Sequence, residues 1–302
     1  MTSTVLHLDT RTIALLTLPP LCWAGNAVVG RAVVGEFPPL ALSLLRWALA
    51  LVLLLPFAWG VMRAERGAIG TVLRTQFGVL MTLSVLGVGV YNSFQYLALQ
   101  TAPAINVTLI ASSAPIFILL IGAVAFGERV RAAQVAGALL SIIGVLVVLV
   151  RGDVSHLWSL QLVAGDLWML AASASWAAYT WLLRRHRPQL ALSSLLALQM
   201  ALGALSIAPF AAWEVGQGAQ VAWSAKTVGA LLFVAVFPSL LAYWCWDRGV
   251  ARAGAVLPVY FANLTPIFAA VLGALLLGET PRPYHAAGLV LIVAGIHLAA
   301  RR

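Results

Sequence analysis

Charged residues are scarce in this chain of 302 residues, where they make up 9% of the total, against the roughly 25% that is typical of soluble domains. Hydrophobic residues make up 62%. This composition excludes a soluble globular protein and leaves no length for a separate soluble domain. The two cysteines, Cys22 and Cys245, fall in apolar stretches and lack metal-ligand spacing. We expect both to pack as small apolar side chains.

Several motifs that would indicate catalysis or ATP use are missing. The sequence contains no GxxxxGK[ST] phosphate-binding loop, no His-Glu-x-x-His zinc motif and no Gly-x-Ser-x-Gly nucleophile elbow. These absences argue against an ATP-driven pump, a zinc peptidase and a serine hydrolase. An intramembrane enzyme would need a nucleophile or a metal-binding set, and the sequence offers only scattered residues of these types. We therefore expect no enzymatic activity, no cofactor and no metal site.

Acidic residues are few and poorly placed for proton coupling. All nine fall at or beyond the ends of the long apolar stretches, and His297 lies close to the end of the last stretch. Proton-driven carriers usually need a titratable group inside the membrane. The sequence therefore favours facilitated diffusion or exchange over tight proton coupling.

The chain is rich in apolar stretches of the roughly 20 residues that are needed to cross about 30 Å of hydrocarbon. No short apolar core with a small-residue cleavage site precedes the first stretch, so we expect the first helix to be retained. The short connections indicate a bundle of antiparallel neighbours. Ten membrane helices are predicted, at about residues 12–34, 38–60, 75–99, 103–126, 131–150, 163–183, 190–212, 226–247, 254–277 and 284–300.

The second half of the chain repeats the first half at an offset of 151 residues. Matches of Pro, Gly and Glu carry this signal, because apolar residues coincide by chance in any membrane sequence. With five helices each, the two copies must have opposite orientations, as in many secondary transporters. We predict an all-α membrane protein with two inverted five-helix repeats, residues 1–152 and 153–302. The matched positions are Pro115–Phe117 with Pro266–Phe268, Gly122 with Gly273, Gly127–Glu128 with Gly278–Glu279, Gly137 with Gly288, and Gly144 with Gly295.

The net charge of +9 reflects orientation in a membrane rather than nucleic-acid binding. If the N-terminus is cytoplasmic, most of the 18 Lys and Arg residues fall in the cytoplasmic connections. By the positive-inside rule, both termini are then cytoplasmic in a bacterial-type inner membrane. A nucleic-acid interface would need a continuous basic face, and the sequence shows none.

Motif residues are distributed over nearly the whole chain. They are Trp23–Asn26, Arg31, Pro38–Pro39, Arg46, Thr101, Asn106, Ser113, Pro115, Gly127–Glu128, Gly165–Asp166, Trp176, Tyr179, Arg184, Tyr243–Trp244, Pro266 and Gly278–Glu279. Their order and spacing resemble the EamA family of the drug/metabolite transporter superfamily. The resemblance implies ten helices, two inverted repeats, a central cavity and transport of small metabolites, with amino-acid exporters prominent among bacterial members. The YddG-like subgroup of aromatic amino-acid exporters would suit an aromatic-rich cavity.

Polar side chains inside the predicted helices are candidates for a substrate site, because they are costly in hydrocarbon unless they are paired or face a watery cavity. Residues three or four positions apart share a helix face, as do Trp23 with Asn26, and Asn92 with Gln95 and Tyr96. Such groups would bind substrate, or instead join neighbouring helices or belong to an interfacial aromatic belt. The predicted substrate-binding residues are Trp23, Asn26, Arg46, Asn92, Gln95, Tyr96, Asn106, Ser113, Trp176, Tyr179, Tyr243 and Asn263.

Arg46 is the clearest basic residue well inside a predicted helix. It would pair with a substrate carboxylate, or its long side chain would reach outward or cap backbone carbonyls at a kink. Pro115 and Pro266 occupy equivalent positions in the two repeats, and a Pro within a helix kinks it. Such kinks would serve as hinges or as static curvature of the bundle.

The sequence thus predicts a secondary transporter that moves small metabolites out of the cytoplasm by alternating access, in a facilitative or exchange mode. Amino acids, including aromatic ones, are the expected substrates. Exporters of other metabolites or cationic drugs with proton coupling, and a membrane sensor without transport activity, are the alternatives. The expected partners are a small-molecule substrate and the lipid bilayer, with the chain acting as a monomer or homodimer.

Overall fold

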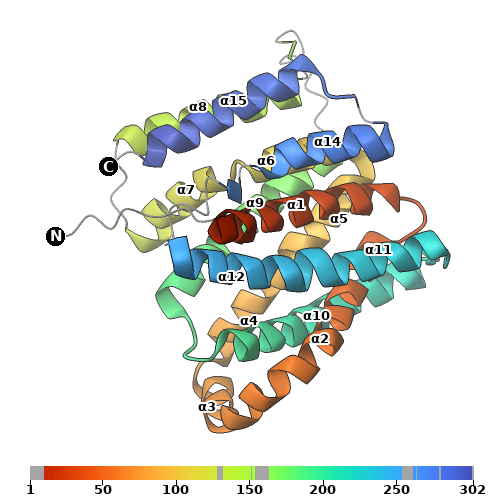
Figure 1. Ribbon diagram of the computed structural model, residues 1–302, viewed down its shortest axis with the longest axis vertical. Helices are drawn as coiled ribbons and strands as arrows, with labels where there is room; N and C mark the ends of the chain where they lie inside the picture. Colours follow the sequence, from red (N-terminus) through yellow and green to blue (C-terminus); the bar gives the residue numbers. More distant parts are fainter. Residues whose placement is uncertain are drawn as a thin grey trace.

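The computed structural model describes residues 10–127, 132–150, 152–153, 163–253, 261–262, 264–278 and 280–300, and every regular element in these ranges is a helix (Figure 1). Asn263, Glu128 and Glu279 lie outside the described residues. The predicted all-α class is therefore confirmed.

The helices of the first half follow the predicted spans, apart from α3, which lies in a predicted connection. They are α1 (Thr10–Ala32), α2 (Pro39–Ala64), α3 (Arg66–Thr75), α4 (Phe77–Ser84), the π-helical segment η1 (Val85–Val90), α5 (Tyr91–Thr101), α6 (Ala104–Ala111), α7 (Ala114–Phe126) and α8 (Ala132–Leu149). Those of the second half are α9 (Ala164–His186), α10 (Leu192–Gly216), α11 (Ala225–Ala235), the π-helical η3 (Val236–Leu241), α12 (Ala242–Ala253), α14 (Thr265–Leu277) and α15 (Pro283–Ala300).

The repeat seen in the sequence is also a repeat of secondary structure. Segment η1 begins at Val85 and η3 begins at Val236, which is 151 residues later, and the same offset relates α7 to α14 and α8 to α15 at both of their ends. Gly127 and Gly278 end α7 and α14 with φ of 63° and 67°. This left-handed backbone favours Gly, which explains why the same residue ends both helices.

The described part of the chain contains ten helical spans. Six segments are long and apolar enough to cross a membrane, namely α1, α2, α4 to α5, α6 to α7, α10 and α11 to α12. The helices α8, α14 and α15 are shorter apolar helices, and α9 completes the set. The repeat-equivalent side chains Val124 and Leu275 are 80% and 75% exposed, as expected of residues that face lipid rather than the bundle. The predicted ten-helix membrane architecture is confirmed.

Two reciprocal contacts join α2 and α10, which pack along each other. A Glu214 carboxylate oxygen near the end of α10 accepts from the backbone N–H of Ala41 at 2.9 Å, in the first turn of α2. Glu65, just after α2, accepts from the N–H of Ala191 at 2.9 Å, at the start of α10. Each carboxylate satisfies unpaired N–H groups at the positive end of the other helix.

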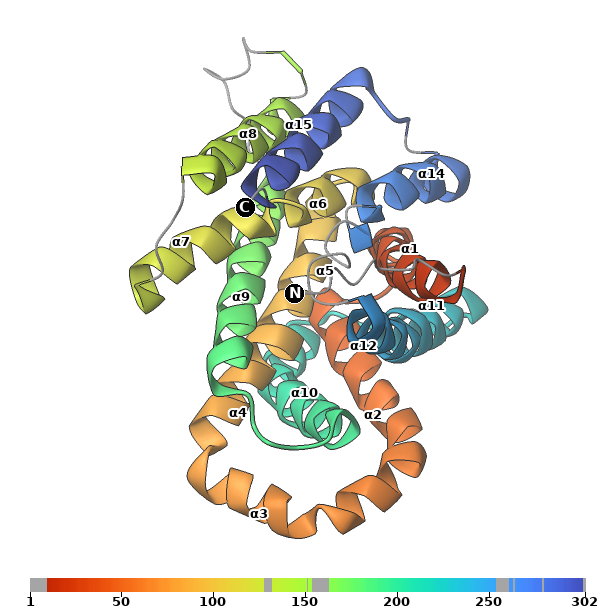
Figure 2. The ribbon, with the colours of Figure 1, turned by 60° about the vertical axis from the view of Figure 1, so that its left-hand side comes forward.

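A second contact between the halves is made by α8 and α15. Helices α8 and α15 lie side by side, and a Cβ at Gly144 would lie only 2.7 Å from the carbonyl oxygen of Gly288 (Figures 1 and 2). In Figure 2, α3 bridges α2 and α4 at one end of the molecule. It has no counterpart at the 151-residue offset. Helix α1 begins on the same side on which α15 ends (Figure 1).

Candidate functional site

A buried arginine forms the centre of a polar network between the two halves. Arg46 of α2 is 2% exposed, and its Nη1 donates to Asn92 Oδ1 at 2.8 Å, to Tyr96 Oη at 3.1 Å and to Asn26 Oδ1 at 3.2 Å. Its Nε donates to Ser239 Oγ at 2.7 Å. Helices α1, α2 and α5 are thereby joined to η3 of the second half.

Spacing along α5 explains how this network is built. Asn92 and Tyr96 are four residues apart and Gln95 lies between them, so all three side chains are presented toward α1 and α2. Asn26 Oδ1 accepts from Tyr96 Oη at 2.7 Å, and Asn26 Nδ2 donates to Gln95 Oε1 at 2.8 Å. Five of the predicted binding residues therefore meet in one cluster.

The π-helical segments contribute irregular backbone at this level. Asn92 Nδ2 donates to the carbonyl oxygens of Gly87 and Val88 in η1, at 3.2 and 3.3 Å. Ser175 of α9 donates to the carbonyl of Leu86, and Ser239 donates to the carbonyl of Val234. Backbone that departs from the α-helix is tolerated at membrane depth where side chains inside the protein satisfy its free carbonyl and N–H groups.

The charge of Arg46 has no carboxylate partner among the described residues. Its hydrogen-bond acceptors are neutral, and its guanidinium lies 4.7 Å from the ring centroid of Trp47 and 5.9 Å from that of Tyr96. A charge inside a membrane bundle is costly and normally pairs with an opposite charge or faces a functional path. The network therefore carries a net positive charge.

Two donors of the network, Arg46 Nη2 and Gln95 Nε2, have no acceptor within the described part of the chain. The fully buried Nε1 of Trp47, next to Arg46 in the chain, lacks a partner there too. So does the fully buried Nε2 of Gln199, whose Oε1 accepts from Tyr179. A buried donor without a partner costs roughly 1–3 kcal/mol. An acceptor-rich group, such as a carboxylate, would reduce this cost.

An aromatic cluster adjoins the network. The Trp176 ring centroid lies 5.0 Å from that of Tyr91 and 5.1 Å from that of Tyr179. Tyr243 packs edge-on against Trp47, with ring centroids 6.2 Å apart, and Trp47 in turn lies beside the Arg46 guanidinium. Tilted rings with polar tips provide apolar surface beside hydrogen-bonding groups. Thus the predicted residues Trp176, Tyr179 and Tyr243 lie near the polar network.

Other predicted residues lie elsewhere. Trp23 packs against Trp246, with ring centroids 5.3 Å apart. Asn106 is hydrogen-bonded through Oδ1 to His285 Nε2 at 3.0 Å, and Ser113 donates to the carbonyl of Ile110 at 2.6 Å. The structure therefore does not bring Asn106 or Ser113 into the Arg46 network.

The two prolines occupy the first turns of their helices. Pro115 lies at the start of α7, directly after the break at Ser112–Ser113 that separates α6 from α7, and Pro266 lies at the start of α14. A Pro is tolerated in a first helical turn because the N–H it lacks would have no partner there. The role of either residue as a hinge stays a prediction.

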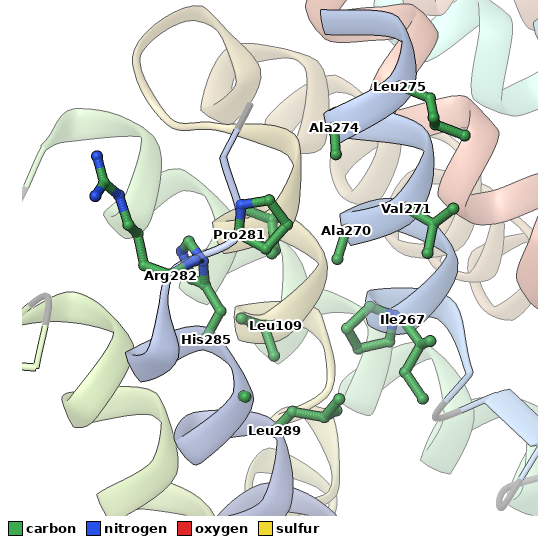
Figure 3. Close-up of a pocket in the computed structure, with 13 residues that line it drawn as sticks. Leu109, Ile267, Ala270, Val271, Ala274, Leu275, Pro281, Arg282, His285 and Leu289 are labelled. Atoms are coloured by element: carbon green, nitrogen blue, oxygen red, sulfur yellow. Dashed lines mark hydrogen bonds between the residues drawn. The ribbon is translucent and has the colours of Figure 1, made fainter. Parts of the chain in front are cut away.

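A lateral groove of about 490 Å³ lies between α6, α14 and α15 (Figure 3). Its walls include Leu109, Ile267, Ala270 and Leu289, so the groove is apolar. In Figure 3, the Arg282 guanidinium points away from these walls. Although Arg282 and His285 lie at its edge, the groove offers a ligand mainly apolar surface, and the polar network is the stronger candidate site.

Sequence reasoning missed Ser239 and Trp47, which contact Arg46, Gln199, which contacts Tyr179, and His285, which pairs with Asn106 outside the network. Ser239 and Gln199 are polar residues within apolar stretches, the same signal that identified Asn26, but a single hydroxyl or amide is common in such stretches. In the described part of the chain, no three His, Cys, Asp or Glu side chains come together in a way that could hold a metal ion.

Comparison with known proteins agrees with this architecture. A solved crystal structure shares the fold, with a TM-score of 0.63 over 96% of both chains at 24% identity. An "Uncharacterized transporter" of Archaeoglobus fulgidus is 29% identical over 96% of this chain and 98% of its own. A "Probable amino-acid metabolite efflux pump" of Salmonella typhimurium is 29% identical, over 95% of this chain and 93% of its own.

A relative with a named substrate class is the "Aromatic amino acid exporter YddG" of Ancylobacter novellus, which is 26% identical over 92% of this chain and 93% of its own. The model of the EamA-like transporter family matches the chain twice, at residues 10–150 and 163–301. Each match covers one set of five helical spans. The chain therefore belongs to the EamA-like transporter family.

Proposed function

We propose that this protein is a secondary transporter that carries amino acids, including aromatic ones, out of the cytoplasm by alternating access in a facilitative or exchange mode. The single observation that carries the proposal is the buried Arg46, which has no carboxylate partner among the described residues. A substrate carboxylate would supply the missing counter-charge and accept from the free Nη2 in a bidentate arrangement.

The neighbouring groups fit the rest of such a substrate. Gln95 Nε2, without an acceptor among the described residues, is a second donor for a carboxylate. The rings of Tyr91, Trp176 and Tyr179 offer an apolar surface against which an aromatic or aliphatic side chain would pack. One part of the site would therefore select the carboxylate and another part the side chain.

The two-half architecture supports alternating access. Ser239 of the second half bonds to Arg46 of the first half, so rocking of the halves would remodel the hydrogen bonds of Arg46. Inverted repeats that rock around a site at their interface are the usual arrangement of secondary transporters. In this proposal, residues 1–152 and 153–302 are the rocking units, both termini are cytoplasmic, the membrane is a bacterial inner membrane, and the chain acts as a monomer or homodimer.

A competition assay in proteoliposomes tests the role of the carboxylate. We expect uptake of labelled phenylalanine to be inhibited by unlabelled phenylalanine but far less by phenethylamine, which lacks the carboxylate. A charge-assisted pair contributes about 1.5–3 kcal/mol, so the amine should compete at least roughly tenfold less well. Equal competition by the amine would contradict carboxylate recognition.

Variants locate the site in the same assay. Arg46→Gln should lose uptake, and Trp176→Ala should weaken uptake of phenylalanine more than uptake of alanine. Arg63→Gln, an exposed substitution outside the network, is the matched control. A monodisperse profile and an intact thermal transition must accompany each loss. A pH gradient that drives accumulation against the substrate gradient would replace the facilitative mode by proton coupling.

A further inference from the structure

Three arginines converge on one small pocket at the end of the bundle where α1 begins. The pocket has a volume of about 240 Å³ and lies between α1 and α12, lined by Arg11, Leu15, Trp244, Arg248 and Arg252. The positive-inside rule explains arginines near helix ends, but it does not explain their convergence on a single concave site.

The geometry of α1 and α12 brings the three arginines together. Trp244, Arg248 and Arg252 are spaced four residues apart on α12, and so lie on one face. The two helices approach closely, because a Cβ at Gly249 would collide with the side chain of Leu16. This approach brings the face of α12 against the first turns of α1, where Arg11 lies.

The pocket is preorganised for an anion. The Arg248 guanidinium lies 4.0 Å from the ring centroid of Trp244, a cation–π contact that holds the charge in place. Among the described residues that line the pocket there is no carboxylate, and the guanidinium groups come from two helices, Arg11 from α1 and Arg248 from α12. Phosphate oxygens match the geometry of several guanidinium groups at once.

The residues around the pocket indicate which kind of phosphate-bearing molecule it would bind. Trp244 is 49% exposed, and Ile13, Leu18 and Leu21 of α1 are also exposed, as side chains that face lipid would be. Leu15 and Trp244 also give the pocket an apolar wall. We propose that the pocket binds the phosphate of an anionic phospholipid of the cytoplasmic leaflet, with the acyl chains lying along α1 and α12.

Basic pockets at the cytoplasmic ends of membrane helices suit such headgroups. The site is separate from the Arg46 network, so the inference does not depend on the proposed substrate; its assignment to the cytoplasmic leaflet rests on the proposed orientation of the termini. Bound lipid would bridge the first and the last third of the chain where α1 meets α12. It would therefore stabilise the bundle at this end without entering the transport path.

Native mass spectrometry of the purified full-length protein tests this site. Detergent-solubilised protein is titrated with phosphatidylglycerol or with phosphatidylcholine, and the dissociation constant of the first bound lipid is measured. We expect phosphatidylglycerol to bind at least tenfold more tightly, and the Arg248→Gln/Arg252→Gln variant to lose roughly tenfold or more in that affinity. Arg63→Gln/Arg74→Gln removes the same charge from exposed positions outside the pocket and should bind like the wild type.

A single substitution on the other helix, Arg11→Gln, should also weaken binding and keeps the test decisive if the double variant does not fold. Equal loss in the pocket and control variants would show general surface attraction and overturn the proposal. Equal affinity for the two lipids would overturn it as well. If inorganic phosphate displaced phosphatidylglycerol at comparable concentration, the site would be one for soluble phosphate, and the lipid assignment would be wrong.

Discussion

Replacing Ser239 by Ala tests whether the link between the halves contributes to the stability of the fold. The side chains of Ser239 and Arg46 are 0% and 2% exposed, and the bond from Arg46 Nε to Ser239 Oγ is 2.7 Å long. The substitution removes this bond and leaves a buried, charged N–H without its acceptor. It also removes the bond from Ser239 Oγ to the carbonyl of Val234.

A matched control separates these two losses. Ser173 is also 0% exposed, and its hydroxyl donates only within its own helix, to the carbonyl of Met169 at 2.9 Å. Ser173→Ala therefore reports the cost of losing a local hydroxyl bond. The difference between the two variants measures the contact with Arg46.

The expected loss of stability follows from the charge of the donor, the Arg46 guanidinium. Hydrogen bonds to charged groups contribute about 1.5–3 kcal/mol, whereas those between membrane helices average nearer to 0.6 kcal/mol. We expect Ser239→Ala to be roughly 1–3 kcal/mol less stable than Ser173→Ala. On the scale of soluble domains, this corresponds to a thermal midpoint lower by about 2–4 °C for each kcal/mol.

Thermal unfolding in detergent micelles, followed by intrinsic tryptophan fluorescence, measures this difference. Ser239→Thr keeps the hydroxyl and should recover part of the loss. If Ser239→Ala and Ser173→Ala had equal midpoints, the bond across the halves would contribute nothing measurable, and the reasoning from burial and charge would be refuted.

Two further substitutions test close packing and helix capping. Gly87→Ala would place a Cβ 2.7 Å from the Tyr179 ring, so we expect a loss of about 1–3 kcal/mol and weaker phenylalanine uptake. Gly78→Ala, which meets no atom within 4 Å, should be tolerated, and equal effects would contradict the packing argument. Glu214→Gln weakens the cap at the start of α2 and should cost about 0.5–1 kcal/mol in thermal unfolding. The exposed Glu36→Gln, which breaks an ion pair at the surface, should cost less.

The sequence predicted the helical spans well because hydropathy and the positions of Pro and Gly are local signals. The span predicted at 103–126 is observed as α6 and α7, and its break falls just before the Pro that marks it. Helix α3 was missed. Its amphipathic pattern is too polar for a search for membrane spans, and it lies in a predicted connection. The π-helical segments were missed because a change of backbone hydrogen-bond register leaves no mark on side-chain periodicity.

The sequence predicted contacts within one helix of the site but not contacts between residues that are far apart along the chain. The grouping of Asn92, Gln95 and Tyr96 follows from their spacing on one helix, so the sequence predicted it. The bond between Arg46 and Ser239 joins residues 193 positions apart, and no periodicity within either helix specifies that partner. Similarly, Asn106 was expected near substrate, whereas the structure pairs it with His285, 179 positions away.

The paired π-helical segments place the same irregular turn at the same point of both halves. Because η1 and η3 keep one offset with α7, α8, α14 and α15, the wider turn belongs to the repeated five-span unit and not to one half alone. Helix α3 has no counterpart at this offset, so it is the element that makes the two halves unequal.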